Sequence, residues 1–232
     1  MFQKARESTK KYHTDLYKKS VLFEKGTWLE KPVPDILAVG KKLTEKHNFL
    51  ALDLGSGIGR NAIPLAKILQ QNGVKIICVD YLPIAIEKLN EYAKKHHVKE
   101  NISGYVSPAE DFLIKKNKYD FIFSHGALAH VKDKKTLLKT LENIANGTKK
   151  NGYVYLSIES DLEEIEMNTK KKIKPLVEVS LTSDELKKIY QDLFKDWTIK
   201  VLRKDPYIEH YEENFKGIEW KCNFMVIVAK KN

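Results

Sequence analysis

The chain has 232 residues, of which 42% are apolar and 31% are charged. This composition supports one sizeable folded domain and excludes a wholly disordered protein. The net charge of +10 comes almost entirely from lysine, because Arg6, Arg60 and Arg203 are the only arginines. Proteins that grip phosphates use arginine forks as well as lysine, so the excess indicates a solvated basic surface rather than a nucleic-acid site.

Two cysteines, Cys78 and Cys222, exclude a disulfide-built scaffold, and neither has the neighbours of a zinc site, so no metal is expected. No apolar run approaches the roughly 18 residues of a membrane-spanning helix. The N-terminal residues lack the apolar core of a signal peptide. These features predict a cytoplasmic protein with no membrane partner.

Residues 1–34 are polar and rich in lysine, with aromatic residues spaced through them. Pro32 and Pro34 punctuate the end of this stretch. Since it is too polar to build a core of its own, we expect it to be a separate N-terminal segment. Residues 35–232 are expected to form the folded domain.

Short apolar runs then alternate with amphipathic helical stretches. The run FLALDL ends in glycines and is typical of a buried parallel strand. Strands that alternate with helices predict an α/β fold with a doubly wound, mostly parallel sheet. The predicted strands cover residues 49–54, 74–80, 102–106, 119–124 and 153–159, and the predicted helices cover residues 62–69, 83–92 and 136–145.

The order changes after residue 160. Residues 161–175 are charged without a core pattern and are expected to form a loop or an irregular helix. A capping-box pattern predicts a helix over residues 181–194. Residues 197–202 and 222–230 are predicted strands with no helix between them, so they should pair as an antiparallel hairpin at the sheet edge. The full prediction is a seven-stranded sheet, with residues 203–221 as a long functional loop.

The most informative stretch is LDLGSGIGRNAI, over residues 52–63, in which an apolar strand runs into Gly55, Gly57 and Gly59 and then into a helix. Glycine lets the backbone turn tightly and approach a ligand closely. A dinucleotide site would need a third spaced glycine, but that position is Arg60, and no phosphate-loop motif is present. The loop therefore indicates a nucleoside cofactor without a pyrophosphate.

Asp80 ends the second predicted strand, 21 residues after Gly59. In a doubly wound sheet this places its carboxylate beside the glycine loop, where it can accept both hydroxyl groups of a ribose. Capping of the helix that begins at Pro83 is an alternative role for Asp80, and the two roles are compatible.

Four stretches in this order resemble motifs of the class I S-adenosylmethionine-dependent methyltransferases, which have a Rossmann-like fold. They are LDLGSGIGRNAIPLA (52–66), VDYLPIAIEKLNEYA (79–93), YDFIFSHGALAHV (119–131) and IANGTKKNGYVYLS (144–157). The N-terminal and C-terminal stretches resemble the tellurite-resistance type of small-molecule methyltransferase. The resemblance implies S-adenosylmethionine as cofactor and methyl transfer to a small-molecule acceptor.

The resemblance also implies roles for individual residues. Asp80 would hold the ribose, and Tyr81 would lie along the adenine. Relatives bind the adenine amino group with an aspartate where this chain has Pro108, which leaves that role to the backbone of Ala109 and the side chain of Glu110 or Asp111. The other cofactor-binding residues implied are Asp53, Gly55, Ser56, Gly57, Gly59, Asn61, Ser124 and His125.

Two histidines near the end of the fourth predicted strand, His125 and His130, are candidates for a general base. The alternative for each is a histidine that satisfies loop backbone groups. Methyl transfer needs a dry site, so residues 1–34 are expected to close over the cofactor as a lid, with Tyr12 and Trp28 near the methyl group. A helix packed on the far side of the sheet is the alternative.

Three functions remain open from the sequence. The favoured one is methyl transfer to a small molecule, and the aromatic residues Tyr207, Tyr211 and Trp220 would then either wall the acceptor pocket or pack as an ordinary satellite cluster. Methyl transfer to RNA is disfavoured, since the chain has no arginine cluster and no added RNA-binding module. A cofactor-binding protein without catalysis is the third. The oligomeric state cannot be read from the sequence.

Overall fold

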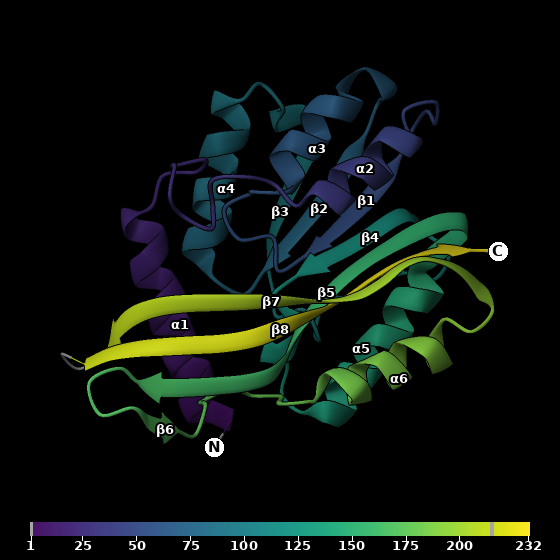
Figure 1. Ribbon diagram of the computed structural model, residues 1–232. Coiled ribbons are helices and arrows are strands. Elements are labelled where there is room, and N and C mark those ends of the chain that lie inside the picture. The colour runs from purple at the N-terminus through teal and green to yellow at the C-terminus, as the bar shows by residue number, and fades with distance from the viewer. Residues whose placement is uncertain (1, 214–215) are drawn as a thin grey trace.

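The computed structural model describes residues 2–213 and 216–232. In this part of the chain eight strands form one sheet with the order β3-β2-β1-β4-β5-β8-β7, and the short β6 pairs with β5 (Figure 1). The strands are β1 Leu50–Leu54, β2 Lys75–Asp80, β3 Ile102–Val106, β4 Tyr119–His125, β5 Thr148–Glu166, β6 Lys171–Ile173, β7 Trp197–Glu213 and β8 Lys216–Lys231.

The first five strands of that order are parallel, as the sequence predicts. β1 and β4 are central, and their side chains are almost all buried, which explains why both read as continuous apolar runs. Because parallel strands end at the same edge, the residues after β1, β2 and β4 are brought together there.

Helices cover both faces of the sheet (Figure 1). One face carries α2 Pro34–Lys42, α3 Ala62–Leu69 and α4 Pro83–Lys95, and the other carries α5 Lys134–Gly147 and α6 Ser183–Leu193. Two separate apolar clusters fill the space between helices and sheet. The capping box of α6 is present: the Thr182 hydroxyl accepts from the Glu185 backbone, and the Glu185 carboxylate accepts from the Thr182 backbone.

The C-terminal half of the sheet departs from the sequence prediction. The antiparallel pair of β7 and β8 is confirmed, but the expected loop over residues 203–221 is wrong, because both strands continue through nearly all of it. Pro206 lies within β7, where it is tolerated because β7 is the edge strand and pairs only with β8. The side chains of residues 205–211 alternate between the two faces of the strand, as the period of two in a strand requires.

The expected loop or irregular helix over residues 161–175 is wrong for residues 161–166 and 171–173, which are strand, whereas residues 167–170 form the turn between them. β5 continues to Glu166 and pairs with β8, with a bulge between Ser160 and Glu163. Asp161 occupies that bulge with φ 51°, and its carboxylate accepts from the backbone of Ser183. The added β6 makes the sheet eight-stranded rather than seven-stranded. Charged residues form strand here because partners on both sides supply backbone hydrogen bonds.

The N-terminal segment begins with helix α1, Phe2–Lys19, followed by an irregular stretch that leads to α2. In Figure 1, α1 lies at the end of the sheet beside the extended parts of β7 and β8. Tyr17, Leu22 and Leu29 are buried in the same apolar cluster as α3 and α4. The segment is therefore anchored at its C-terminal half by apolar contacts.

Candidate functional site

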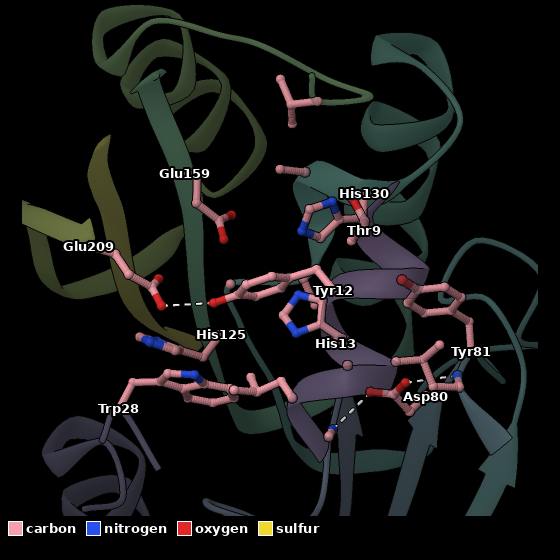
Figure 2. Close-up of a pocket in the computed structure, with 18 of the residues that line it drawn as sticks. Thr9, Tyr12, His13, Trp28, Asp80, Tyr81, His125, His130, Glu159 and Glu209 are labelled. Carbon is pink, nitrogen blue, oxygen red and sulfur yellow. Dashed lines mark hydrogen bonds between the residues drawn. The ribbon is translucent and has the colours of Figure 1, made fainter. Parts of the chain in front are cut away.

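A cavity of about 940 Å³ opens at the carboxyl edge of the parallel strands. Its walls come from the glycine loop after β1, the ends of β2 and β4, helix α1, and the extended part of β5, β7 and β8 (Figure 2). The expected site residues that line it are Tyr12, Trp28, Gly55, Ser56, Gly57, Asn61, Asp80, Tyr81, Ala109, Glu110, His125 and His130.

The glycine loop has a backbone that other residues rarely adopt. Gly55 and Gly57 have φ angles of 79° and 51°. A Cβ atom on Gly57 would lie 2.7 Å from the hydroxyl oxygen of Tyr17, and one on Gly55 would collide with Ala127. The missing side chains therefore let Ala127 and Tyr17 pack closely against the backbone of the loop.

Asp80 holds the glycine loop and caps the next helix at the same time. Its Oδ2 accepts from the Gly57 backbone at 2.8 Å, and its Oδ1 accepts from the Leu82 backbone at 3.0 Å. Burial raises the pKa of Asp80 to about 6, against the lowering effect of these backbone donors. A carboxylate has further lone pairs, so it can also accept the hydroxyl groups of a ribose.

Three expected site residues lie behind the wall rather than on it. Asp53 is buried, and that burial holds its pKa well above the usual range. Ser124 donates its hydroxyl to the Leu54 carbonyl at 2.7 Å. A Cβ atom on Gly59 would meet the side chains of α3 and α4, so this glycine allows close packing there. These residues support the loop from below.

An arginine that the sequence analysis did not single out closes the side of the cavity at Tyr81. Arg6 of α1 forms an ion pair with Glu110 at 2.6 Å, and its guanidinium carbon lies 5.3 Å from the centre of the Tyr81 ring. A second carboxylate, Glu178, lies 3.6 Å from Nε of Arg6. Nothing in the local sequence pairs residues 6 and 110, so only the tertiary structure reveals this contact.

The two candidate histidines have opposite electrostatic environments. His125 is hydrogen-bonded through Nδ1 to the Tyr155 hydroxyl at 2.9 Å, and burial lowers its pKa to about 3, so it is neutral near pH 7. Nδ1 of His130 lies 3.0 Å from Glu178. Burial alone would lower the pKa of His130, but this hydrogen bond and the charges of Glu159 and Glu178 raise it instead.

A third histidine, His13 of α1, was missed by the sequence analysis. Its ring centre lies 6.3 Å from that of His130. Burial and the charge of His130 together lower its pKa to about 3, so His13 is neutral near pH 7. His13 and His130 therefore bring two imidazoles from segments far apart in sequence to one side of the cavity (Figure 2).

Tyr12 and Trp28 both reach the cavity wall. The Tyr12 hydroxyl donates to Glu209 at 2.9 Å, which connects α1 to β7 across the cavity (Figure 2). The ring of Trp28 lies under the guanidinium of Arg60, 5.6 Å from its carbon. Asn61 ties the same N-terminal segment to the glycine loop, because its Oδ1 accepts from the Val33 backbone at 2.9 Å.

The far wall comes from one face of the extended strands. Residues two apart on each strand share that face, which the register between β5, β8 and β7 makes continuous. The sequence showed this face only as an alternation of aromatic and acidic residues within an expected loop. Its members in the cavity are Glu159, Glu164, Tyr207, Glu209, Tyr211, Trp220 and Phe224.

The residues at the glycine loop fit S-adenosylmethionine. The backbone of Gly55 and Gly57 lines the cavity, and Asp80 offers carboxylate oxygens beside it. The Ser56 hydroxyl is buried and has no hydrogen-bond partner, so it is available to a ligand. The absence of a third glycine at Arg60 leaves no pyrophosphate site of the dinucleotide type. Fold and site together define a nucleoside-cofactor protein with a doubly wound sheet.

Comparisons with known proteins agree with this description. The sequence model of a family described as "Methyltransferase domain" matches residues 45–196. The chain belongs to this methyltransferase family, its fold is that of the class I enzymes, and S-adenosylmethionine is its cofactor. No protein of curated function matches the chain in sequence.

Several solved structures share the fold. TehB from Haemophilus influenzae has a TM-score of 0.63 and 20% identity, with coverage of 90% of this chain and 64% of TehB. A phosphoethanolamine N-methyltransferase 2 from Haemonchus contortus was solved with phosphomonomethylethanolamine and S-adenosylhomocysteine. It has a TM-score of 0.60 and 16% identity, with coverage of 100% of this chain and 60% of that protein. A SAM-dependent methyltransferase from Methanosarcina mazei has a TM-score of 0.56 and 17% identity, with coverage of 87% of this chain and 98% of that protein. The chain thus spans less than two thirds of the length of each of the first two proteins.

In the part of the chain that the structure describes, no helix has the length and apolar character needed to cross a membrane.

Proposed function

We propose that this protein transfers a methyl group from S-adenosylmethionine to a small-molecule acceptor. The observation that carries the proposal is the continuity of the cavity. It runs from the glycine loop and Asp80 to the far wall on β5, β7 and β8, and α1 covers its side. A cavity of about 940 Å³ leaves room for an acceptor beside a nucleoside cofactor.

The chain's own residues would position both reactants. The backbone of Gly55 and Gly57 would lie against the cofactor, Asp80 would accept hydrogen bonds from the ribose, and Tyr81 would pack along the adenine. Ala109 and Glu110 lie on the same side of the cavity, where they would contact the base. S-adenosylmethionine, when bound, supplies a methyl group already activated on a positively charged sulfur. The protein therefore needs chiefly to align the acceptor and exclude water.

We infer that residues 1–34 act as a lid over this cavity. Three contacts of α1 support the proposal: Arg6 with Glu110, Tyr12 with Glu209, and Tyr17 at Gly57. Each joins the helix to a different wall. The first half of α1 is held mainly by polar contacts, which break and re-form more readily than a packed apolar core. The lid would thus open for exchange of ligands and close to exclude water.

The histidines would have different roles. His125 is neutral and hydrogen-bonded to Tyr155, so it would orient ligands rather than carry charge. His130 is paired with Glu178, which raises its pKa, and it would hold or release a proton as a general acid or base. Because both cysteines are free and buried, we place the reaction in a reducing compartment, the cytoplasm.

Calorimetry followed by an acceptor screen tests the proposal. The purified protein should bind S-adenosylmethionine and S-adenosylhomocysteine in the micromolar range and bind NAD far more weakly. Candidate acceptors should then be screened by the S-adenosylhomocysteine that they release. Tight binding of NAD without a signal from S-adenosylmethionine would contradict the proposal. Cofactor binding without turnover of any acceptor would identify a sensor rather than an enzyme.

A further inference from the structure

Glu159 of β5 lines the cavity, yet its carboxylate has an unsatisfied oxygen. The residue is only 8% exposed, and its Oε2 has no hydrogen-bond partner. Among the residues that the structure describes, no lysine, arginine or histidine forms an ion pair with it. A buried carboxylate without a partner is strongly destabilising, so such groups are normally paired with a cation or a donor. The unsatisfied oxygen therefore points to a positively charged ligand.

The other carboxylate oxygen of Glu159, Oε1, lies beside Gly126 and Phe224. Gly126, just after β4, has no side chain there: a Cβ atom at this position would lie 3.1 Å from Oε1 of Glu159 and 3.6 Å from the ring of Phe224. Glu159 and Phe224 are direct cross-strand partners on β5 and β8. The carboxylate thus lies beside an aromatic ring in a space that the glycine keeps open.

Aromatic rings continue from Phe224 along the far wall. The ring centre of Tyr207 lies 5.5 Å from that of Phe224 and 6.0 Å from that of Trp220. Aromatic faces attract cations, and ammonium ions in particular. Glu209, which accepts the Tyr12 hydroxyl, adds a second carboxylate to the same wall.

Two of the histidines near this wall carry no positive charge. His125 and His13 are neutral near pH 7, because burial lowers the pKa of each to about 3. Arg60 donates to the Lys31 carbonyl at 2.8 Å and lies over Trp28. His130 is paired with Glu178. Arg6, Lys11, Lys19 and Arg60 also line the cavity, so the attraction for a cation is local to Glu159 and Glu209 on the wall itself.

From these contacts we propose that the acceptor carries a basic amine, which Glu159 binds as the ammonium ion against the aromatic wall of Tyr207, Trp220 and Phe224. This proposal rests on the proposed methyl transfer and names its acceptor class. The amine must lose one proton before its nitrogen can react, and Glu159 is the group that takes it. Burial and the charge of Glu178 raise the pKa of Glu159, against the effect of His130, which suits it to hold a proton.

The transfer then balances in atoms and charge. The nitrogen lone pair forms the new nitrogen–carbon bond while the carbon–sulfur bond breaks and its electron pair stays on sulfur. The sulfonium charge is thereby removed, and the methylated nitrogen becomes an ammonium ion. The proton held by Glu159 passes to solvent when the product leaves.

The place of Glu159 in the site argues that it serves the acceptor rather than the sulfonium. Figure 2 shows Glu159 and Glu209 on the opposite side of the Tyr12 ring from Asp80 and Tyr81. The cavity thus has a cofactor end, defined by Asp80 and Tyr81, and an acceptor end, defined by Glu159 and Glu209.

The test is calorimetry on the full chain saturated with S-adenosylhomocysteine. The probes are butylamine, 1-butanol and butanoate, and their 2-phenylethyl counterparts, which share a skeleton and differ in one group. We expect the amine of each set to bind at least about tenfold more tightly than the alcohol, and the carboxylate not at all. Glu159→Gln should remove this preference, leave the alcohol unchanged, and bind S-adenosylmethionine and S-adenosylhomocysteine as the parent does.

Glu163→Gln is the matched control, because it removes the same charge from the same strand. Glu163 pairs with Lys172 outside the cavity, so the preference for amines should persist. Equal binding of amine and alcohol by the parent, or an undiminished preference in Glu159→Gln, would overturn the proposal. So would a loss in Glu159→Gln of S-adenosylmethionine affinity alone, since Glu159 would then serve the sulfonium. Failure of S-adenosylhomocysteine to bind the parent would instead overturn the proposed function.

Discussion

The two ends of the cavity are built differently. The cofactor end consists of one short loop and one carboxylate at the end of the adjacent strand, and it presents mainly backbone: Gly55, Gly57 and the groups that Asp80 holds in place. The acceptor end consists of side chains from α1, β5, β7 and β8. Backbone sites tolerate little variation in conformation, whereas a wall of side chains can change its chemistry by substitution without altering the fold.

This difference teaches where specificity resides. The sheet edge and glycine loop define the cofactor, which is the same across the family. The acceptor must be recognised by the far wall and the N-terminal helix, whose residues lie mostly outside residues 45–196 that match the family. The following experiments disrupt one end of the cavity and leave the other end intact, and they are ordered from the largest expected effect to the smallest.

Removal of residues 1–13 should abolish turnover. It deletes Arg6, Tyr12 and His13 from the cavity but keeps Tyr17 and Leu22, which are buried in the core. We expect the sheet to stay folded by circular dichroism and cofactor affinity to fall several-fold, because the Tyr81 side of the site loses Arg6. Normal turnover by the shortened chain would show that α1 is not a lid.

Asp80→Ala should weaken S-adenosylmethionine and S-adenosylhomocysteine alike. Loss of hydrogen bonds to a buried carboxylate costs about 1–3 kcal/mol, or about 5- to 150-fold in the dissociation constant measured by calorimetry. Binding of butylamine, measured without cofactor, should not change. An unaltered dissociation constant in a folded variant would leave Asp80 as a helix cap only.

Gly57→Ala should affect both stability and the cofactor end. A left-handed backbone costs a non-glycine residue about 1–2 kcal/mol, and here the new Cβ atom would also press on Tyr17. We therefore expect a lower melting temperature and about tenfold weaker cofactor binding. Gly73→Ala is the matched control, because Gly73 has φ 66° but only ordinary contacts around its Cβ position. It should lower the melting temperature similarly and leave cofactor binding intact.

Cofactor affinity should fall in acid. The pKa of Asp80 is raised to about 6, so the carboxylate is ionised above that value and protonated below it. Only the ionised form accepts both hydroxyl groups of a ribose, so affinity should be steady above pH 7 and decline toward pH 5, approaching about tenfold per unit. Asp80→Asn should flatten this dependence. A parent affinity that rises as the pH falls would contradict the assignment.

The smallest effect is expected from the surface lysines, which belong to neither end. Any binding of RNA should be weak and should disappear as salt rises from about 50 to 200 mM, as diffuse phosphate contacts do. A filter-binding titration against unrelated RNA sequences measures this. A sequence-selective complex at physiological salt would favour RNA as the acceptor instead.

The parallel half of the fold and the cofactor end were predictable because their signals are local. Buried strands such as β1 read as apolar runs, and the glycines and Asp80 occupy fixed places at strand ends. Asp53 and Ser124 illustrate the limit: their positions beside the site were predictable, but whether their side chains face the cavity depends on packing. Both lie behind the wall.

The sequence by itself determined where the parallel strands lie along the chain, the turn at Gly55 and Gly57, and the carboxylate that meets it, since each depends on residues close together in the chain. Only the tertiary structure decided that residues 203–213 continue as strand, because a partly polar strand is stabilised by hydrogen bonds from β8 rather than by its own pattern. The same holds for the acceptor end. Glu159, Tyr12 and Glu209 share a cavity because strand register and the placement of α1 bring them together across long separations in sequence.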